Sequence, residues 1–79
     1  MFIVYILKSL KDNKRYIGFT EDIERRIQEH NNGLVKSTKN RRPFALIHSE
    51  SFEVKQEALN KEKFYKTGKG REFLKKLNL

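Results

Sequence analysis

The chain has 79 residues, a formal net charge of +8 at pH 7 from 18 lysines and arginines against 10 acids, and no cysteine. This length fits a single domain, residues 1–79, with a small core. The missing cysteine excludes disulfides and cysteine-based zinc sites, and His30 and His48 are too far apart for an HExxH metalloprotease motif. The apolar residues 1–7 are too few to span a bilayer and do not resemble a signal peptide, so we expect a cytoplasmic protein that does not bind membranes.

The positive charge favours nucleic acid as the partner, because a basic domain of this size attracts polyanions. The alternative is a lysine-rich surface that serves solubility alone. The basic residues recur along the whole chain, which favours a folded basic surface over a disordered arm. The candidate nucleic-acid contacts come from the two densest groups and are Lys36, Lys39, Arg41, Arg42, Lys66, Lys69 and Arg71.

The first part of the chain predicts a β-hairpin followed by a helix. Phe2–Leu7 is a continuous apolar run, typical of a strand buried on both faces, and residues 15–19 predict a second strand after a polar turn. Gly18 inside that strand indicates a close backbone approach or a bulge. Thr20 is the expected N-cap of a helix that ends at residues 31–33.

The second part predicts one more strand and two helices. Residues 34–42 form a basic loop, and Phe44–His48 is the third strand. A helix is expected over Lys55–Lys66, and a short last helix from Arg71. The order ββαβαα predicts an α+β fold, with a small three-stranded antiparallel or mixed sheet flanked by helices.

One acidic side chain interrupts the apolar stripe of the helix over Lys55–Lys66. Ala58, Glu62 and Tyr65 lie at i, i+4 and i+7, which places the carboxylate among apolar neighbours. Glutamate is rarely buried without a partner, so Glu62 is expected to face a cleft that holds a cation. The alternative is a structural ion pair with a neighbouring arginine or lysine.

Two further pairs of residues are candidates for chemistry. Arg26 and His30 share one helix face, where Arg26 suits a phosphate oxygen and His30 suits a proton or the same phosphate. The alternative is that both are solvated. Tyr5 and Tyr16 lie on the two strands of one hairpin, so their rings are able to meet. The sequence does not fix the hairpin register, and tyrosines in strands more often belong to the core.

Four segments in order resemble the GIY-YIG nucleases. Ile-Val-Tyr at residues 3–5 and Tyr-Ile-Gly at 16–18 resemble the paired GIY and YIG signatures, with the tyrosines eleven positions apart (16 − 5). Residues 22–31 are similar to the family's first helix, in which a His or Tyr follows an arginine by four positions. Residues 58–62 resemble the helix that carries the metal-binding glutamate. The resemblance covers essentially the whole chain.

The resemblance implies an endonuclease that hydrolyses DNA phosphodiester bonds in DNA repair or recombination, with RNA as the alternative substrate. It implies Mg²⁺ or Mn²⁺ held by Glu62, and Arg26 as the group that stabilises charge on the phosphate. Two positions depart from the pattern: Ile3 replaces the first glycine of GIY, and Phe19 stands where some relatives have a lysine.

The resemblance also implies a role for the tyrosines. Tyr5 would be the general base, with its pKa lowered by nearby positive charge, Tyr16 would orient it, and His30 would share the task. Gly18 would let the backbone come close to substrate or metal. We expect a monomer or weak homodimer. The alternative classes are a nucleic-acid-binding module without catalysis and a partner-binding domain of a larger assembly.

Overall fold

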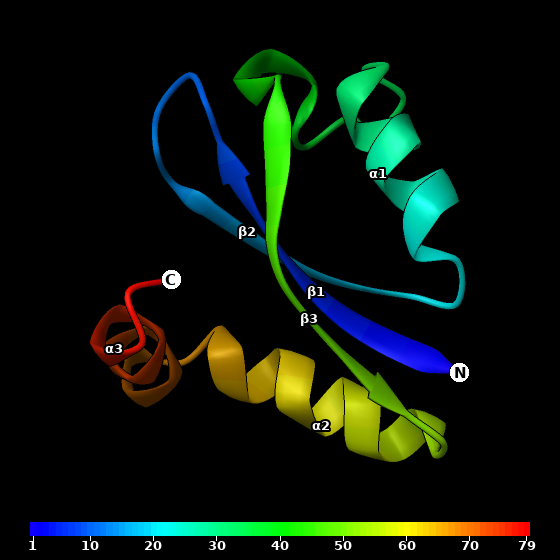
Figure 1. Ribbon diagram of the computed structural model, residues 1–79, viewed down its shortest axis with the longest axis vertical. Helices are drawn as coiled ribbons and strands as arrows, with labels where there is room; N and C mark the ends of the chain where they lie inside the picture. Colours follow the sequence, from blue (N-terminus) through cyan, green and yellow to red (C-terminus); the bar gives the residue numbers. More distant parts are fainter.

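A three-stranded antiparallel sheet of order β2-β1-β3 is covered by helices on both faces in the computed structural model, which describes all 79 residues (Figure 1). Helix α1 covers one face, and α2 and α3 cover the other (Figure 1). The elements are β1 (Phe2–Ser9), β2 (Arg15–Thr20), α1 (Ile23–Asn31), a 3₁₀ turn (Lys39–Arg41), β3 (Phe44–Phe52), α2 (Lys55–Tyr65) and α3 (Gly68–Lys76). The predicted α+β class and element order are confirmed, and every strand pair is antiparallel.

Strand β1 is central because its side chains are apolar on both faces. Val4, Tyr5, Ile6 and Leu7 are all fully buried, as the continuous apolar run predicts. Val4 and Ile6 pack with residues of α2 and α3, whereas Tyr5 and Leu7 pack with residues of α1. Alternation along one strand therefore assigns Tyr5 to the α1 face of the sheet.

Both the N-cap of α1 and the start of α3 differ from expectation. Asp22 caps α1, since its carboxylate accepts a hydrogen bond from the backbone N–H of Arg25, and the Thr20 hydroxyl instead accepts one from Asp22. Helix α3 starts at Gly68, before Arg71, because the Thr67 side chain caps it by accepting from the N–H of the third residue.

Strand β3 is longer than expected and runs to Phe52, beyond His48. It pairs with the full length of β1, from Phe2 opposite Phe52 to Ser9 opposite Phe44. A register irregularity between Ile6 and Leu7 accommodates one extra residue in β3. The polar residues after His48 hid this extension in the sequence, because an edge strand tolerates polar side chains on its solvent side.

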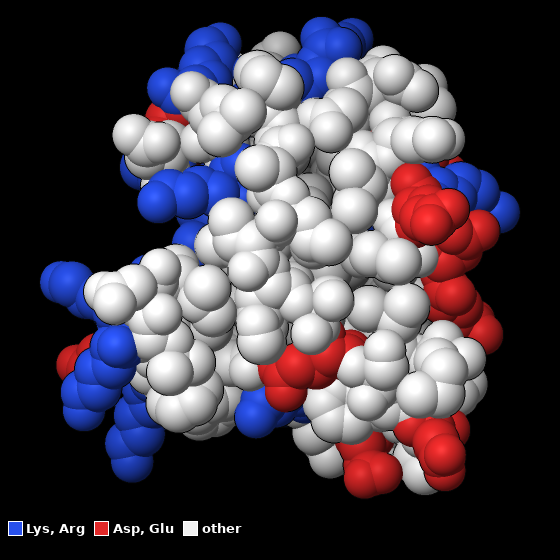
Figure 2. Space-filling model, viewed as in Figure 1, with Lys and Arg blue, Asp and Glu red and all other residues white.

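Charges are segregated on the surface. Lysines and arginines gather around the β1–β2 turn and α3, whereas most of the acids in view lie along the opposite edge, where α1 and α2 begin (Figure 2). The exposed acids at those helix starts are Glu21, Asp22, Glu24, Glu53 and Glu57. None of the helices has the length and apolar character needed to cross a bilayer.

Candidate active site

A chain of buried hydrogen bonds joins β1, α1 and the loop before β3. The Tyr5 hydroxyl lies 2.9 Å from His30 Nε2, and His30 Nδ1 lies 2.8 Å from Thr38 Oγ1. All three residues are fully buried. A buried polar group without a hydrogen-bond partner costs free energy, so these hydrogen bonds hold the three side chains in fixed positions relative to one another.

The direction of these hydrogen bonds follows from their last member. The Thr38 hydroxyl donates to the carbonyl oxygen of Val35 at 3.4 Å, so its oxygen is left to accept the Nδ1–H of His30. His30 then carries no proton on Nε2, and this nitrogen accepts the hydroxyl proton of Tyr5. The phenol oxygen keeps its lone pairs for other donors.

Burial determines the protonation of both groups. It lowers the pKa of His30 to about 4, with a further contribution from the positive charge of Arg26, so His30 is neutral near pH 7. Burial also raises the pKa of Tyr5, and the hydrogen bond from Arg26 only partly offsets this. The lowered pKa expected for Tyr5 is therefore wrong, since desolvation of the phenolate outweighs the neighbouring guanidinium.

Arg26 lies on the solvent side of these hydrogen-bonded residues. Its Nε donates to the Tyr5 hydroxyl oxygen at 3.3 Å, and Nη1 pairs with Glu29 at 3.2 Å. The Arg26 side chain keeps 33% of its exposure, whereas Arg25 keeps 74% and makes only a 3.9 Å pair with Glu29. Arg26 is thus oriented by the Tyr5 hydroxyl and still reachable from solvent.

Tyr16 and Gly18 complete the α1 face of the hairpin. The centroid of the Tyr16 ring lies 4.8 Å from that of the His30 ring and 6.3 Å from that of the Tyr5 ring. The Tyr16 hydroxyl has no hydrogen bond within the chain. Tyr5 is paired with Gly18 across the strands, and a Cβ on Gly18 would collide with the Tyr5 hydroxyl. The glycine thus provides the space that the Tyr5 phenol occupies.

Glu62 lies on α2, close enough to Tyr5 for its charge to contribute to the raised pKa of that phenol. Its side chain is 20% exposed and pairs with Lys66 at 3.1 Å, one helical turn further on. The structural ion pair that the sequence left open is therefore present, although Lys66 is 55% exposed. An exposed i,i+4 ion pair contributes little to the stability of the fold. A cation of higher charge, such as a divalent metal ion, is therefore able to replace Lys66 at the Glu62 carboxylate.

No group of three or more histidine or acidic side chains converges anywhere in the structure; Glu29 is paired with Arg26, and Glu62 is the acid whose charge acts on Tyr5. Such a site does not fit an ion that requires an all-protein cage, such as structural zinc. It fits Mg²⁺ or Mn²⁺, which keeps several waters and needs only one or two carboxylates besides substrate phosphates.

The predicted nucleic-acid contacts are dispersed. Lys36, Lys39 and Arg42 are exposed in the loop before β3, and Lys66, Lys69 and Arg71 are exposed where α2 meets α3. Arg41 has a structural role, because it pairs with Asp12 at 3.0 Å and donates to two carbonyl oxygens of the β1–β2 hairpin. The sequence missed Thr38, since a lone threonine in a basic loop carries no signal of its buried contact with His30.

The fold and the order of its motifs are those of a known family of catalytic domains. Residues 1–78 match the family described as the GIY-YIG catalytic domain, and the chain belongs to that family. Proteins of the family are usually nucleases that act on DNA, and they generally use divalent metal ions.

Within the family, the chain is similar to small proteins of the UPF0213 group. It is 49% identical to UPF0213 protein SSP2268 of Staphylococcus saprophyticus, over 81% of this chain and 78% of that protein. It is 46% identical to UPF0213 protein YazA of Bacillus subtilis, over 78% of this chain and 63% of that protein. The solution NMR structure of UPF0213 protein BH0048 from Bacillus halodurans is 38% identical, with a TM-score of 0.59 over 98% of this chain and 85% of that one. These names state no activity.

The buried His30 predicts an acid-sensitive fold. The unfolded chain binds a proton on this histidine near pH 6.5, whereas the folded chain keeps it neutral down to about pH 4. The unfolded state therefore binds more protons in this window, and stability falls as pH drops from about 7 to about 4, by up to about 3 kcal/mol. Urea unfolding at several pH values measures the loss. His30→Gln should be less stable at pH 7 and lack this part of the pH dependence; the same dependence in both proteins would contradict the assignment.

Proposed function

We propose that this chain is a divalent-metal-dependent endonuclease that hydrolyses DNA phosphodiester bonds. The observation that carries the proposal is the hydrogen-bonded chain Arg26–Tyr5–His30, with Glu62 nearby. It combines an accessible guanidinium for a phosphate with a proton-accepting route, and the Glu62 carboxylate is close enough for its charge to act on Tyr5. Each of these groups is present once, which supports one cut per bound domain. The first substrates to test are branched and nicked DNA, as found in repair or recombination.

Glu62 is the residue that would hold the metal ion, which supplies Lewis-acid polarisation of the phosphate when bound. Lys66 would give up its pair with Glu62, and its exposed ammonium would then be available to the phosphates of the DNA. A purely anion-binding surface gains nothing from a half-buried acid, so the position of Glu62 supports a catalytic role over simple binding.

Arg26 is placed to hold the scissile phosphate. Its Nε is engaged with Tyr5 and one Nη with Glu29, which fixes the plane of the guanidinium while leaving other N–H donors free. When the substrate binds, the guanidinium exchanges the Tyr5 oxygen for the phosphate, and its charge then stabilises the transition state. This arrangement also brings the phosphate next to the Tyr5 oxygen.

Tyr5 and His30 form the proton route. The attacking water gives its proton to the Tyr5 phenol oxygen, while the phenol proton passes along the existing hydrogen bond to His30 Nε2. Tyr5 remains neutral throughout, so the raised pKa of this phenol does not oppose the step. The burial that lowers the pKa of His30 does oppose it, and the negative charge of the bound phosphate would offset this. The route requires neutral His30, and it requires Arg26 to turn toward the phosphate, which uncovers the buried phenol oxygen.

One observation favours a second candidate, a nucleic-acid-binding module without catalysis. Glu62 is already paired with Lys66, as a structural acid would be. The two candidates differ in a direct experiment, because only the nuclease converts supercoiled plasmid or branched DNA to cut products in Mg²⁺ or Mn²⁺ and stops when EDTA removes the ion.

Glu62→Gln should abolish metal-dependent cleavage and leave DNA affinity unchanged or slightly higher, because the change removes one negative charge beside a polyanion. The matched control is Glu57→Gln, an exposed acid on the same helix, which should cleave like the wild type. Plasmid nicking and anisotropy on preparations free of host nucleases measure both properties. Full activity in Glu62→Gln would remove this residue as the metal ligand.

Arg26→Ala should lower kcat by roughly 10²–10³ with little change in affinity, because the guanidinium stabilises charge that develops in the transition state. Arg25→Ala is the matched control on the neighbouring, more exposed position, and it should lose only modest, salt-dependent binding. Single-turnover cleavage at saturating protein separates the two effects. Equal losses in both variants would mean that α1 offers only a diffuse basic face.

Tyr5→Phe should lose most of the cleavage rate while the domain stays folded, at a cost of about 1–3 kcal/mol because His30 Nε2 loses its partner. Tyr16→Phe should be less damaging, since its hydroxyl lies outside the proton route. The wild-type cleavage rate should not change with pH above neutrality. It should fall only as the pH drops toward the pKa of His30, about 4. A folded Tyr5→Phe that cuts at the wild-type rate would remove Tyr5 from the mechanism.

A further inference from the structure

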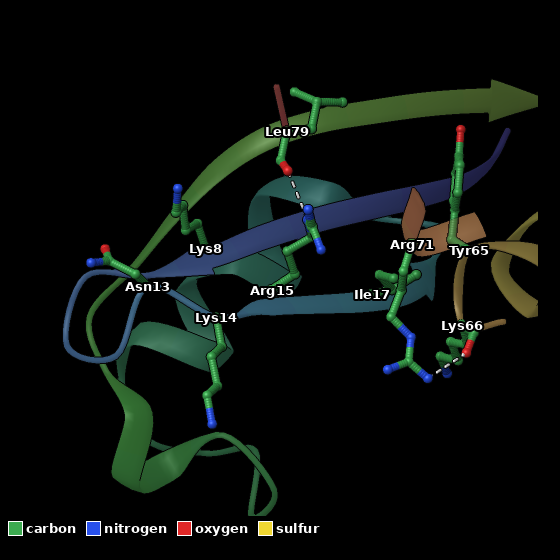
Figure 3. Close-up of a pocket in the computed structure, with 9 residues that line it drawn as sticks. All are labelled: Lys8, Asn13, Lys14, Arg15, Ile17, Tyr65, Lys66, Arg71 and Leu79. Carbon is green, nitrogen blue, oxygen red and sulfur yellow. Dashed lines mark hydrogen bonds between the residues drawn. The ribbon is translucent and has the colours of Figure 1, made fainter. Parts of the chain in front are cut away.

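A basic pocket lies on the opposite sheet face from Tyr5, between the β1–β2 turn, the end of α2 and α3 (Figure 3). Its volume is about 550 Å³, and no acid lines it. Five cationic side chains dominate the lining, namely Lys8, Lys14, Arg15, Lys66 and Arg71. The remaining lining residues are Asn13, Ile17, Tyr65 and Leu79.

The charges of this pocket are largely uncompensated. Lys66 pairs with Glu62, whereas the other four cations form no ion pair with an aspartate or glutamate of the chain. The pocket therefore holds positive charge that the fold itself does not neutralise, so it attracts an anion from solution.

Two of these cations are direct neighbours across the strands. Lys8 on β1 is the cross-strand partner of Arg15 on β2, and both line the same pocket. Like charges directly opposite each other across strands are destabilising. An anion between them would convert this repulsion into two attractive contacts, which is the arrangement expected of a binding site rather than of a solvated surface.

Main-chain oxygens, rather than aspartate or glutamate side chains, hold the arginines in place. Arg15 Nε donates to a main-chain oxygen of Leu79, the last residue of the chain, at 2.8 Å, and an Arg71 Nη donates to the carbonyl oxygen of Lys66 at 3.3 Å (Figure 3). Arg41 bonds the carbonyl groups of Lys14 and Arg15 from the other side of the turn. Each guanidinium of the pocket is thereby oriented while several of its donors remain free.

We propose that this pocket binds a phosphate of the nucleic-acid substrate other than the one that is cut. This inference rests on the proposed function, because it assigns the pocket to the same DNA. Lys66 connects the two sites, since it lines the pocket and pairs with Glu62, whose charge acts on Tyr5. A phosphate held here sets the position of the strand relative to the cleavage site, as backbone contacts do in other nucleic-acid complexes.

The test compares two variants that lose equal charge. Lys8→Gln with Arg15→Gln removes the cross-strand pair, and Lys55→Gln with Lys76→Gln removes two exposed lysines outside the pocket. Affinity for a short labelled DNA duplex is measured in EDTA at several salt concentrations. The pocket variant should bind on the order of tenfold more weakly than the control variant, and its salt-dependence slope should fall by about one.

Circular dichroism melting shows whether each variant is folded. If the first pocket variant fails to fold, Lys14→Gln with Arg71→Gln takes its place, with the same expected loss. Equal affinity and slope for a folded pocket variant and the control would overturn the proposal. This result is separate from the cleavage assay, because binding in EDTA requires neither the metal ion nor Glu62.

Discussion

The buried hydrogen bonds from Tyr5 through His30 to Thr38 are the constraint on which the candidate site depends. They join the central strand, α1 and the loop before β3, three segments that are far apart in sequence. Neither histidine nitrogen is left without a partner, and no buried side-chain polar atom in the structure is unpaired. A polar network in which some groups lack partners destabilises a core. Tyr5 is therefore held in its position only when α1 and the loop before β3 are also in theirs.

The sheet imposes the second condition. Tyr5 faces α1 only because the neighbouring Val4 and Ile6 face α2 and α3, so a shift of one residue in register would bury the phenol against the wrong helices. Gly18 adds a local requirement, because any side chain opposite Tyr5 would occupy the volume of its hydroxyl. The fold and the site are therefore specified by the same few positions of β1 and β2.

Patterns local to one element could be predicted from the sequence. The apolar run of β1, the acid within the stripe of α2 and the shared face of Arg26 and His30 are all consequences of strand or helix periodicity. The direction of the Tyr5 pKa shift and the role of Thr38 could not be predicted, because both depend on burial produced by packing between distant segments. The start of α3 was missed because the glycines beside Thr67 favour a loop until its capping bond is known.

Charge placement explains how one small chain could combine an anionic ligand with an acidic residue. Most exposed acids lie at the starts of α1 and α2, away from the basic turn and α3 (Figure 2). Among the acids that lie elsewhere is Glu62, and Lys66 balances its charge. In the proposed mechanism, a divalent cation replaces Lys66 at the carboxylate, and the lysine is then free to neutralise a phosphate. Metal binding and DNA binding would thus favour each other, because each removes a charge that opposes the other.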